Sequence, residues 1–201
     1  MNNLKVSISK GNTKMGAIPS VSLPACITCN PDAPCFKGCY AVKLAKRFEA
    51  TDASYHRNLD VLKSNPELYW LQVKAAACMT RYFRYHVSGD IVNKEYFNNM
   101  IKLANELTGT KFLVFTKQYH IINEYLNNGG IIPSNLKVIL SNWGTWKCNN
   151  PHKLPVCEVI FKGDQPDDDW KICGGNCTDC ACRGVGCWEV KNNETIAIYK
   201  H

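Results

Sequence analysis

The chain has 201 residues, which favours a single domain spanning 1–201 whose core is large enough to fold without covalent crosslinks. Its formal net charge of +7 comes from Lys and Arg residues spread along the chain rather than gathered in a block, which argues against a dedicated nucleic-acid surface. The chain has no apolar leader and no run able to cross a bilayer, so we expect a cytoplasmic protein with no membrane partner. In that compartment the closely spaced thiols among its 12 cysteines are expected to be metal ligands or catalytic groups rather than disulfides.

The first part of the chain predicts one short strand and three helices. Alternating apolar residues favour a strand at 5–9, which precedes a cysteine-rich segment at 26–39. Apolar residues at helical spacing then predict helices over 40–50 and 53–65, and a third helix over 66–79 starts with a proline.

From residue 82 onward, predicted strands and helices alternate. The strands are expected at 82–89, 111–117, 136–143, 156–163 and 194–200, and the helices at 93–109 and 119–130. Such alternation implies right-handed β-α-β units around a parallel sheet. About six mostly parallel strands favour an α/β fold of the small or partial (β/α) barrel kind, with an open α/β sheet as the alternative.

Polar side chains follow three of the predicted strands. In α/β folds the carboxyl ends of parallel strands form one edge where functional groups gather. The catalytic candidates at this edge are a proton donor, a hydrogen-bonding carboxylate and an anion-binding ammonium: His86, Asp90 and Lys117. The cofactor-binding candidates are Ser88, Gly89, Ser141 and Trp143, whose indole offers a stacking surface. The structural alternatives are a core histidine, a helix-capping aspartate, a solvated lysine and a core tryptophan.

Two segments concentrate the cysteines. The first, 26–39, has the spacing C-x2-C-x5-C-x3-C and holds Cys26, Cys29, Cys35 and Cys39, and the second, 173–187, holds Cys173, Cys177, Cys180, Cys182 and Cys187. Short spacings bring soft thiolates onto one ion or cluster, and nearby glycines let the backbone turn tightly around it. The remaining cysteines, Cys78, Cys148 and Cys157, are isolated in the sequence and are predicted as small apolar core residues.

Thiolate-rich sites suit both zinc and iron–sulfur clusters. Zinc sites usually pair two C-x2-C units across a longer loop, which neither segment does. The short, uneven intervals favour iron–sulfur, and "CGGNCTDC" at 173–180 has a C-x3-C-x2-C spacing that lets three thiolates hold a cubane while its fourth iron stays open. We therefore expect one or two [4Fe-4S] clusters, with zinc as the alternative.

An ordered series of short motifs resembles a phage protein family called Gene product 88. The motifs are "SLPACITCNPDAPCFKGCYA", "RYHVSGD", "FLVFTK", "VILSNW" and "CWEVKNNETIAIYKH", and the resemblance runs from about residue 11 to the end. It implies a phage or prophage origin, three amino-terminal thiols matching Cys29, Cys35 and Cys39, and a carboxyl-terminal group of four cysteines. Cys26 is then an additional thiol, and 173–187 offers one cysteine more than the family pattern needs, which leaves the choice among Cys177, Cys180 and Cys182 open.

Cysteine loops beside a small α/β sheet are also similar to the radical S-adenosylmethionine superfamily, which would imply S-adenosylmethionine as a cofactor. This chain departs from that pattern, because its C-x3-C-x2-C spacing lies at the carboxyl-terminal end.

Three functions remain open: a redox or radical-type enzyme with a small-molecule substrate, an electron-transfer protein, and a zinc-stabilised module that binds nucleic acid or a host protein. We favour the enzyme, because polar residues at strand ends have little use in a simple carrier. We expect the amino-terminal cysteines to be chemically active and the carboxyl-terminal cysteines to support structure or relay electrons.

Overall fold

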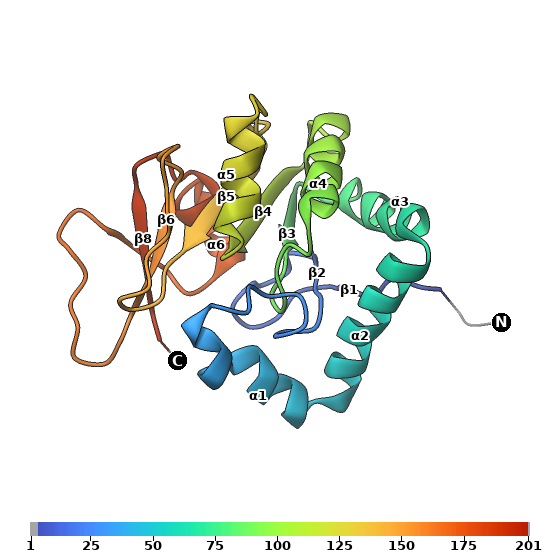
Figure 1. The fold of residues 1–201 in the computed structure, drawn as a ribbon, viewed down its shortest axis with the longest axis horizontal. Helices are drawn as coiled ribbons and strands as arrows, with labels where there is room; N and C mark the ends of the chain where they lie inside the picture. The colour runs from blue at the N-terminus through green and yellow to red at the C-terminus, as the bar shows by residue number, and fades with distance from the viewer. Residues whose placement is uncertain (1–3, 201) are drawn as a thin grey trace.

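Eight strands form one mostly parallel sheet in the computed structural model, which describes residues 4–200 (Figure 1). The strands are β1 (Ile8–Ser9), β2 (Ser20–Val21), β3 (Tyr82–Tyr85), β4 (Lys111–Thr116), β5 (Leu136–Ser141), β6 (Val156–Ile160), β7 (Lys171–Ile172) and β8 (Thr195–Tyr199). Their order across the sheet is β1-β2-β3-β4-β5-β6-β8-β7, and only the β1–β2 pair is antiparallel. The sheet is open, with β1 and β7 at its edges.

Six α-helices and two short 3-10 helices connect the described strands. They are η1 (Pro34–Gly38), α1 (Tyr40–Arg47), α2 (Glu49–Ser64), α3 (Pro66–Ala77), α4 (Lys94–Glu106), α5 (Tyr119–Asn127), α6 (Cys177–Arg183) and η2 (Gly186–Trp188). Asparagine side chains cap three of these helices: Asn65 accepts from Leu68 N, and Asn93 and Asn176 do the same at the starts of α4 and α6.

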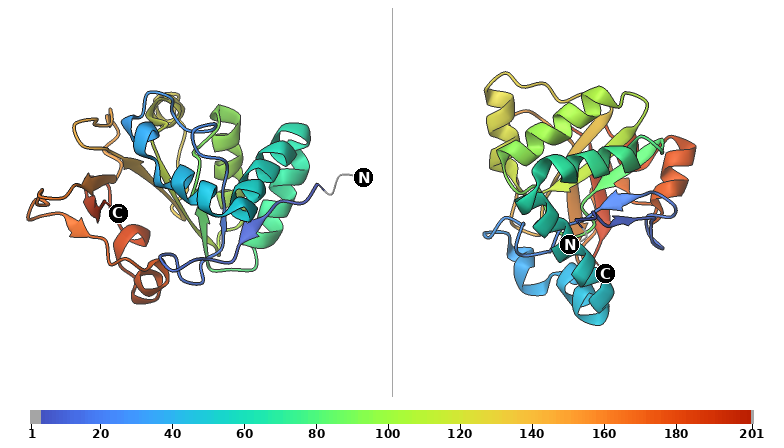
Figure 2. Two further views of the ribbon diagram at one scale, coloured as in Figure 1. Left: turned by 90° about the horizontal axis from the view of Figure 1, so that it is seen from below. Right: turned by 90° about the vertical axis from the view of Figure 1, so that its right-hand side faces the viewer.

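The strand order decides which face of the sheet each helix covers. From β2 to β6 each parallel strand is added on the same side of the previous one, and right-handed connections that advance in one direction place their helices on one face. The core on this face, which we call the helix face, contains residues of α2, α3, α4 and α5 (Figures 1 and 2). The order reverses at the end, where β7 lies outside β8, so a right-handed connection from β7 to β8 places α6 on the opposite face.

Alternating side chains of the central strands fill both faces. On β4, Phe112 and Val114 belong to the core of the helix face, whereas Leu113 belongs to a second core that also contains Trp188. Cysteines from 173–187 pack against this second core, so we call this side of the sheet the cysteine face. Burial on both sides is usual for parallel strands and explains why they are nearly continuous apolar runs.

All six predicted strands and all five predicted helices are present. The prediction missed β2 and β7, which have two residues each and are too short for an alternating pattern, and it missed α6, whose cysteines indicated a ligand loop. The predicted helix over 40–50 ends at Arg47, and a separate helix begins at Glu49. The α/β class with a mostly parallel sheet is confirmed, with eight strands rather than about six.

The core of the cysteine face should be essential for stability. Leu113 lies on the central strand β4 and is fully buried, whereas Leu71 on α3 is 63% exposed. We expect Leu113→Ala to lower the free energy of unfolding by about 2–5 kcal/mol, because it leaves a cavity. The control Leu71→Ala should change it by less than about 0.5 kcal/mol. Urea unfolding of both variants measures this, and equal losses would contradict the assignment of this core.

Candidate functional site

The amino-terminal cysteine loop leaves β2 at the carboxyl edge of the sheet and is fastened to the end of β3. Leu23 N donates to Ser88 O at 3.0 Å, and Asp90 N donates to Thr28 Oγ1 at 3.2 Å. Gly89, between these two contacts, has φ +80°, and a Cβ there would lie 2.6 Å from Thr28 Oγ1 and 2.7 Å from Leu23 O. The loop can therefore approach this closely only because residue 89 is glycine.

Asp90 joins the ends of β3 and β4. Its Oδ1 accepts from Thr116 Oγ1 and from its neighbour Ile91 N, both at 2.7 Å, and its Oδ2 accepts from Lys117 N at 2.8 Å. Burial raises the pKa of Asp90, while these hydrogen bonds and the Lys117 ammonium oppose the rise. Because both carboxylate oxygens are engaged, this side chain positions the two strand ends.

Lys117 carries a positive charge at this edge. Its Nζ donates to Ser141 Oγ at 2.8 Å and lies 5.9 Å from the ring centroid of Trp143. Asn30 Nδ2 donates to Lys117 O at 3.0 Å, which ties the cysteine loop to the end of β4. The structure thus brings together Asp90, Lys117, Ser141 and Trp143 from three strand ends.

The four thiols of the amino-terminal cysteine group (Cys26, Cys29, Cys35 and Cys39) influence one another. Burial raises the pKa of Cys29 to about 12, and nearby Asp90, Cys39 and Cys26 add to the rise. Burial also raises the pKa of Cys35, which Lys117 partly offsets. Burial raises the pKa of Cys26, and the nearby thiols of Cys39 and Cys35 raise it further, so this additional thiol lies near the others. This group therefore converges beside Asp90 and Lys117.

His86 is directed to the helix face. Its ring is 4% exposed, and its Nε2 lies 3.0 Å from Tyr96 OH, which in turn bonds Tyr69 OH. Burial, with a smaller effect from Arg84, lowers the pKa of His86 to about 3 and keeps the ring neutral. None of its hydrogen bonds reaches Asp90 or Lys117, so the structure does not bring it together with those two candidates. Ser88 makes its contact through the backbone. Its carbonyl accepts a hydrogen bond from Leu23 N, whereas its Oγ is buried without a hydrogen-bond partner.

The carboxyl-terminal cysteine segment is anchored to the cysteine face of the sheet. Tyr82 OH, on β3, donates to Ala181 O at 3.1 Å, and Trp188 Nε1 donates to Cys177 O at 3.2 Å. Thr178 Oγ1 donates to Met15 O at 2.9 Å, so a turn near the start of the chain also holds α6. Figure 2 shows this early turn beside the carboxyl-terminal helices.

Four thiols of this segment form the carboxyl-terminal cysteine group: Cys173, Cys177, Cys180 and Cys187. Burial raises the pKa of Cys187, and Cys173, Cys157 and Cys177 raise it further. Cys180 Sγ lies so near residue 186 that a Cβ on Gly186 would be 3.1 Å from it. Cys182, by contrast, is exposed on α6. Of the three cysteines among which the sequence left the ligand choice open, Cys177 and Cys180 pack with this group, whereas Cys182 does not.

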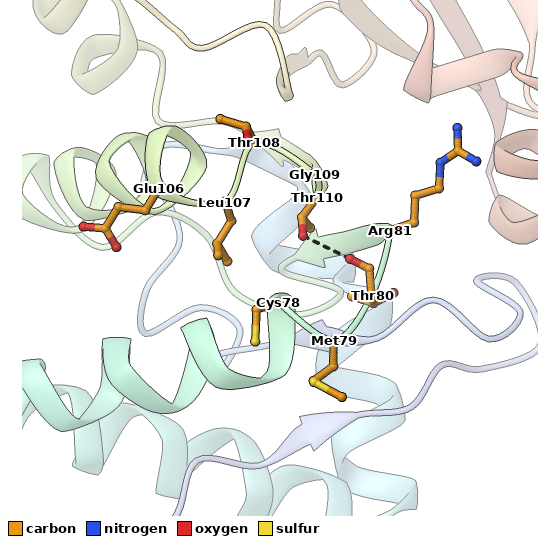
Figure 3. A pocket seen from close by; sticks show the side chains of 9 residues that line it. All are labelled: Cys78, Met79, Thr80, Arg81, Glu106, Leu107, Thr108, Gly109 and Thr110. Carbon is orange, nitrogen blue, oxygen red and sulfur yellow. Dashed lines mark hydrogen bonds between the residues drawn. The ribbon is translucent and has the colours of Figure 1, made fainter.

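Two open pockets lie at opposite ends of the strands. The larger, about 500 Å³, is lined by 78–81 and 106–110 at the amino ends of β3 and β4, where Thr110 Oγ1 donates to Thr80 O (Figure 3). It contains none of the candidate site residues. The smaller pocket, about 390 Å³, lies at the carboxyl edge and is lined by Thr28, Cys29, Asn93, Gln118 and His120, among others. Of the amino-terminal cysteine group, Cys29 lines this pocket.

Among residues 4–200, no three His, Cys, Asp or Glu side chains are already arranged so that they could hold a metal ion. Within the same described range, no helix is long and apolar enough to cross a membrane.

Comparison with known proteins identifies the family. A family model described as Gene product 88 matches residues 2–195, which is nearly the whole chain. The chain belongs to the Gene product 88 family. No curated protein and no solved structure matches it. The likeness to the radical S-adenosylmethionine superfamily stays a prediction.

Sequence reasoning missed several residues that this Gene product 88 structure places at the site. Thr28 and Asn30 fasten the cysteine loop to the strand ends, and only their position beside cysteines could have suggested this. Arg84 donates to Cys177 Sγ at 3.5 Å although 93 residues separate them. Cys157, predicted as a core residue, is buried but also lies with Cys173 and Cys187. No local pattern indicates contacts of such long range.

The close approach at Gly89 gives a test with a matched control. Gly89 and Gly129 have nearly identical φ angles of +80° and +79°, but no heavy atom lies within 4 Å of a Cβ built on Gly129. Gly129→Ala should cost only about 1–2 kcal/mol of unfolding free energy, from the left-handed backbone. Gly89→Ala should cost about 1–3 kcal/mol more, because the methyl group overlaps the cysteine loop. Urea denaturation compares the two variants, and equal losses would show that the loop does not pack as described.

The neutral, buried His86 predicts a pH dependence of stability. Its pKa is about 3 when folded and 6.5 in the unfolded chain, so the unfolded state binds the proton more readily and stability falls as pH drops below 6.5. Between pH 7.5 and 5.0 this contribution should amount to about 2 kcal/mol. We expect His86→Asn to reduce the slope of unfolding free energy against pH, and exposed His120→Asn to leave it unchanged. An unchanged slope in the His86 variant would contradict its neutral state.

Proposed function

We propose that this member of the Gene product 88 family is an iron–sulfur protein with one [4Fe-4S] cluster at each cysteine group, and that it acts as a redox or radical-type enzyme. The observation that carries the proposal is the grouping of four thiols in each of the two cysteine segments, one group lying beside Asp90 and Lys117 and the other packed on one core. A bound [4Fe-4S] cluster would supply one-electron transfer and, at an incompletely ligated iron, a binding position for a small molecule.

The donor sets fit such clusters. Thiolates are the ordinary protein ligands of [4Fe-4S] clusters, and each group offers four within a short segment. Beside Cys180, position 186 is a glycine, where a Cβ would lie only 3.1 Å from its sulfur. The carboxyl-terminal ligands proposed are Cys173, Cys177, Cys180 and Cys187.

The amino-terminal group is proposed as the reactive one. Cys29, Cys35 and Cys39 are the proposed ligands, with Cys26 outside the ligand set. Their surroundings contain an ammonium, a hydroxyl and a half-buried indole, all at the carboxyl edge of the sheet. A carrier that only transfers electrons has no evident use for such groups, which favours an enzyme.

In this enzyme the chain's own residues would bind and position the substrate. Lys117 would bind a carboxylate or phosphate, with Ser141 orienting its Nζ. Trp143 would offer a flat apolar surface, and Asp90 would keep the two strand ends together. The pocket beside Cys29 would admit the small molecule, for which S-adenosylmethionine remains one candidate. The sheet, whose strands follow in chain order from β1 to β6, would serve as a partial barrel around this edge.

The second candidate function is electron transfer without a substrate of its own. The carboxyl-terminal group favours this function, because its thiols pack against a core and burial raises the pKa of Cys187. Such a closed centre is suited to storing or relaying an electron. A zinc-stabilised binding module is the remaining alternative.

Cysteine variants of anaerobically purified protein test the proposal. The wild-type protein should bind about eight irons and about eight labile sulfides per chain, four for each cluster. Cys35→Ser and Cys180→Ser should each lose about half of both, because each removes one proposed ligand. The controls Cys182→Ser and Cys78→Ser, at exposed positions, and Cys26→Ser should retain full iron.

Small-ligand perturbation of the paramagnetic spectrum then separates enzyme from carrier. A response that survives in Cys180→Ser but disappears in Cys35→Ser supports a reactive amino-terminal group. The opposite pattern would reverse the roles, and no response from either centre would favour the carrier. Stoichiometric zinc without labile sulfide would contradict the iron–sulfur proposal.

A further inference from the structure

Arg84 lies on β3 and is directed to the cysteine face, between alternating neighbours that face the helices. Its Nη1 donates to Cys177 Sγ at 3.5 Å, and its Cζ lies 4.9 Å from the ring centroid of Phe115. The aromatic ring holds the guanidinium against the sheet through a cation–π contact. Arg84 therefore has a fixed position beside the carboxyl-terminal cysteine group.

The hydrogen bonding of Arg84 is incomplete. Its Nε is buried and has no hydrogen-bond partner, and none of the ion pairs within residues 4–200 includes Arg84. A buried donor without an acceptor costs about 1–3 kcal/mol, and a partly buried cation without a counterion costs more. The described part of the protein therefore supplies neither a hydrogen-bond acceptor for Nε nor a counterion for the guanidinium.

The thiols surrounding Arg84 identify where that negative charge would be. Its positive charge opposes the effect of burial on the pKa of Cys157, Cys177 and Cys187. Arg84 also opposes the rise that burial causes in the pKa of Tyr40, the residue that follows Cys39. The hydrogen bond to Cys177 Sγ places Arg84 beside the carboxyl-terminal group.

A centre ligated by four thiolates carries a net negative charge that increases when an electron is added. Hydrogen bonds to the sulfurs and nearby positive charge are among the factors that raise the reduction potential of such a centre. Arg84 provides both in one side chain. It would satisfy its own Nε at the same time, by donating to a sulfur that is not part of the protein.

We propose that Arg84 is a positioning residue that hydrogen-bonds the sulfurs of the carboxyl-terminal centre and makes this centre easier to reduce. This inference rests on the proposed iron–sulfur function. The step is the transfer of one electron from an external one-electron donor to the cluster, with no bond made or broken. Arg84 gains no proton and loses none.

The test is a redox titration with dithionite, followed by paramagnetic resonance. The signal that is lost in Cys180→Ser identifies the carboxyl-terminal centre. In Arg84→Gln its midpoint potential should shift to more negative values, and the signal of the other centre should shift less. Arg84→Lys keeps the charge but loses the Nε donor, so its potential should lie between those of the wild-type protein and Arg84→Gln.

Arg81→Gln is the matched control, because Arg81 precedes the same strand and is exposed over the Tyr82 ring. It removes the same formal charge and should leave both potentials unchanged. If iron is bound in full and Arg84→Gln titrates like the wild-type protein, the role of Arg84 is refuted while the iron–sulfur function stands. Equal shifts in the Arg81 and Arg84 variants would also refute it, since only net charge would matter. Absence of iron in the wild-type protein would overturn both proposals.

Discussion

The direction in which strands are added to the sheet is the constraint on which the rest of this structure depends. Right-handed connections between parallel strands put their helices on one face as long as the order advances the same way. From β2 to β6 it does, and the helix face is filled. The reversal between β7 and β8 sends the last connection to the other face, and that connection contains the carboxyl-terminal cysteines. The topology thus gives the cysteine-rich segment a sheet face of its own.

The same parallel arrangement places the amino-terminal cysteines at the carboxyl edge. They follow the first parallel strand, so their loop meets the residues that follow β3 and β4. Thr28 Oγ1 then accepts a hydrogen bond from Asp90 N, which holds the loop, and Gly89 allows the close contact. The candidate site is therefore rigid where the loop meets the strand ends. A reactive centre benefits from this, because positioned groups lose little freedom when a substrate binds.

The two cysteine groups differ in surroundings, and the difference suggests different tasks. The amino-terminal group adjoins an open pocket and the charged side chain of Lys117. The carboxyl-terminal group packs against Trp188 and the central strands, and Arg84 donates to one of its thiols, Cys177 Sγ. Exposure to small molecules favours chemistry at the first, whereas burial and a fixed positive charge favour electron storage at the second.

The sequence by itself determined six of the eight described strands, five of the six described α-helices and the grouping of the cysteines. These follow from local patterns, since periodicity and spacing act over a few residues. It also correctly placed Asp90, Lys117, Ser141 and Trp143 at one edge, because parallel strand ends meet there. Only the tertiary structure decided that His86 turns to the helix face, where its left-handed backbone directs the ring to Tyr96. It also decided that Arg84 and Cys157 join the carboxyl-terminal cysteines, and that Cys182 does not. Those outcomes depend on which strands become neighbours and on which face of the sheet each connection crosses. Both depend on the strand order of the whole sheet, including its one reversal, and local sequence patterns do not contain that order.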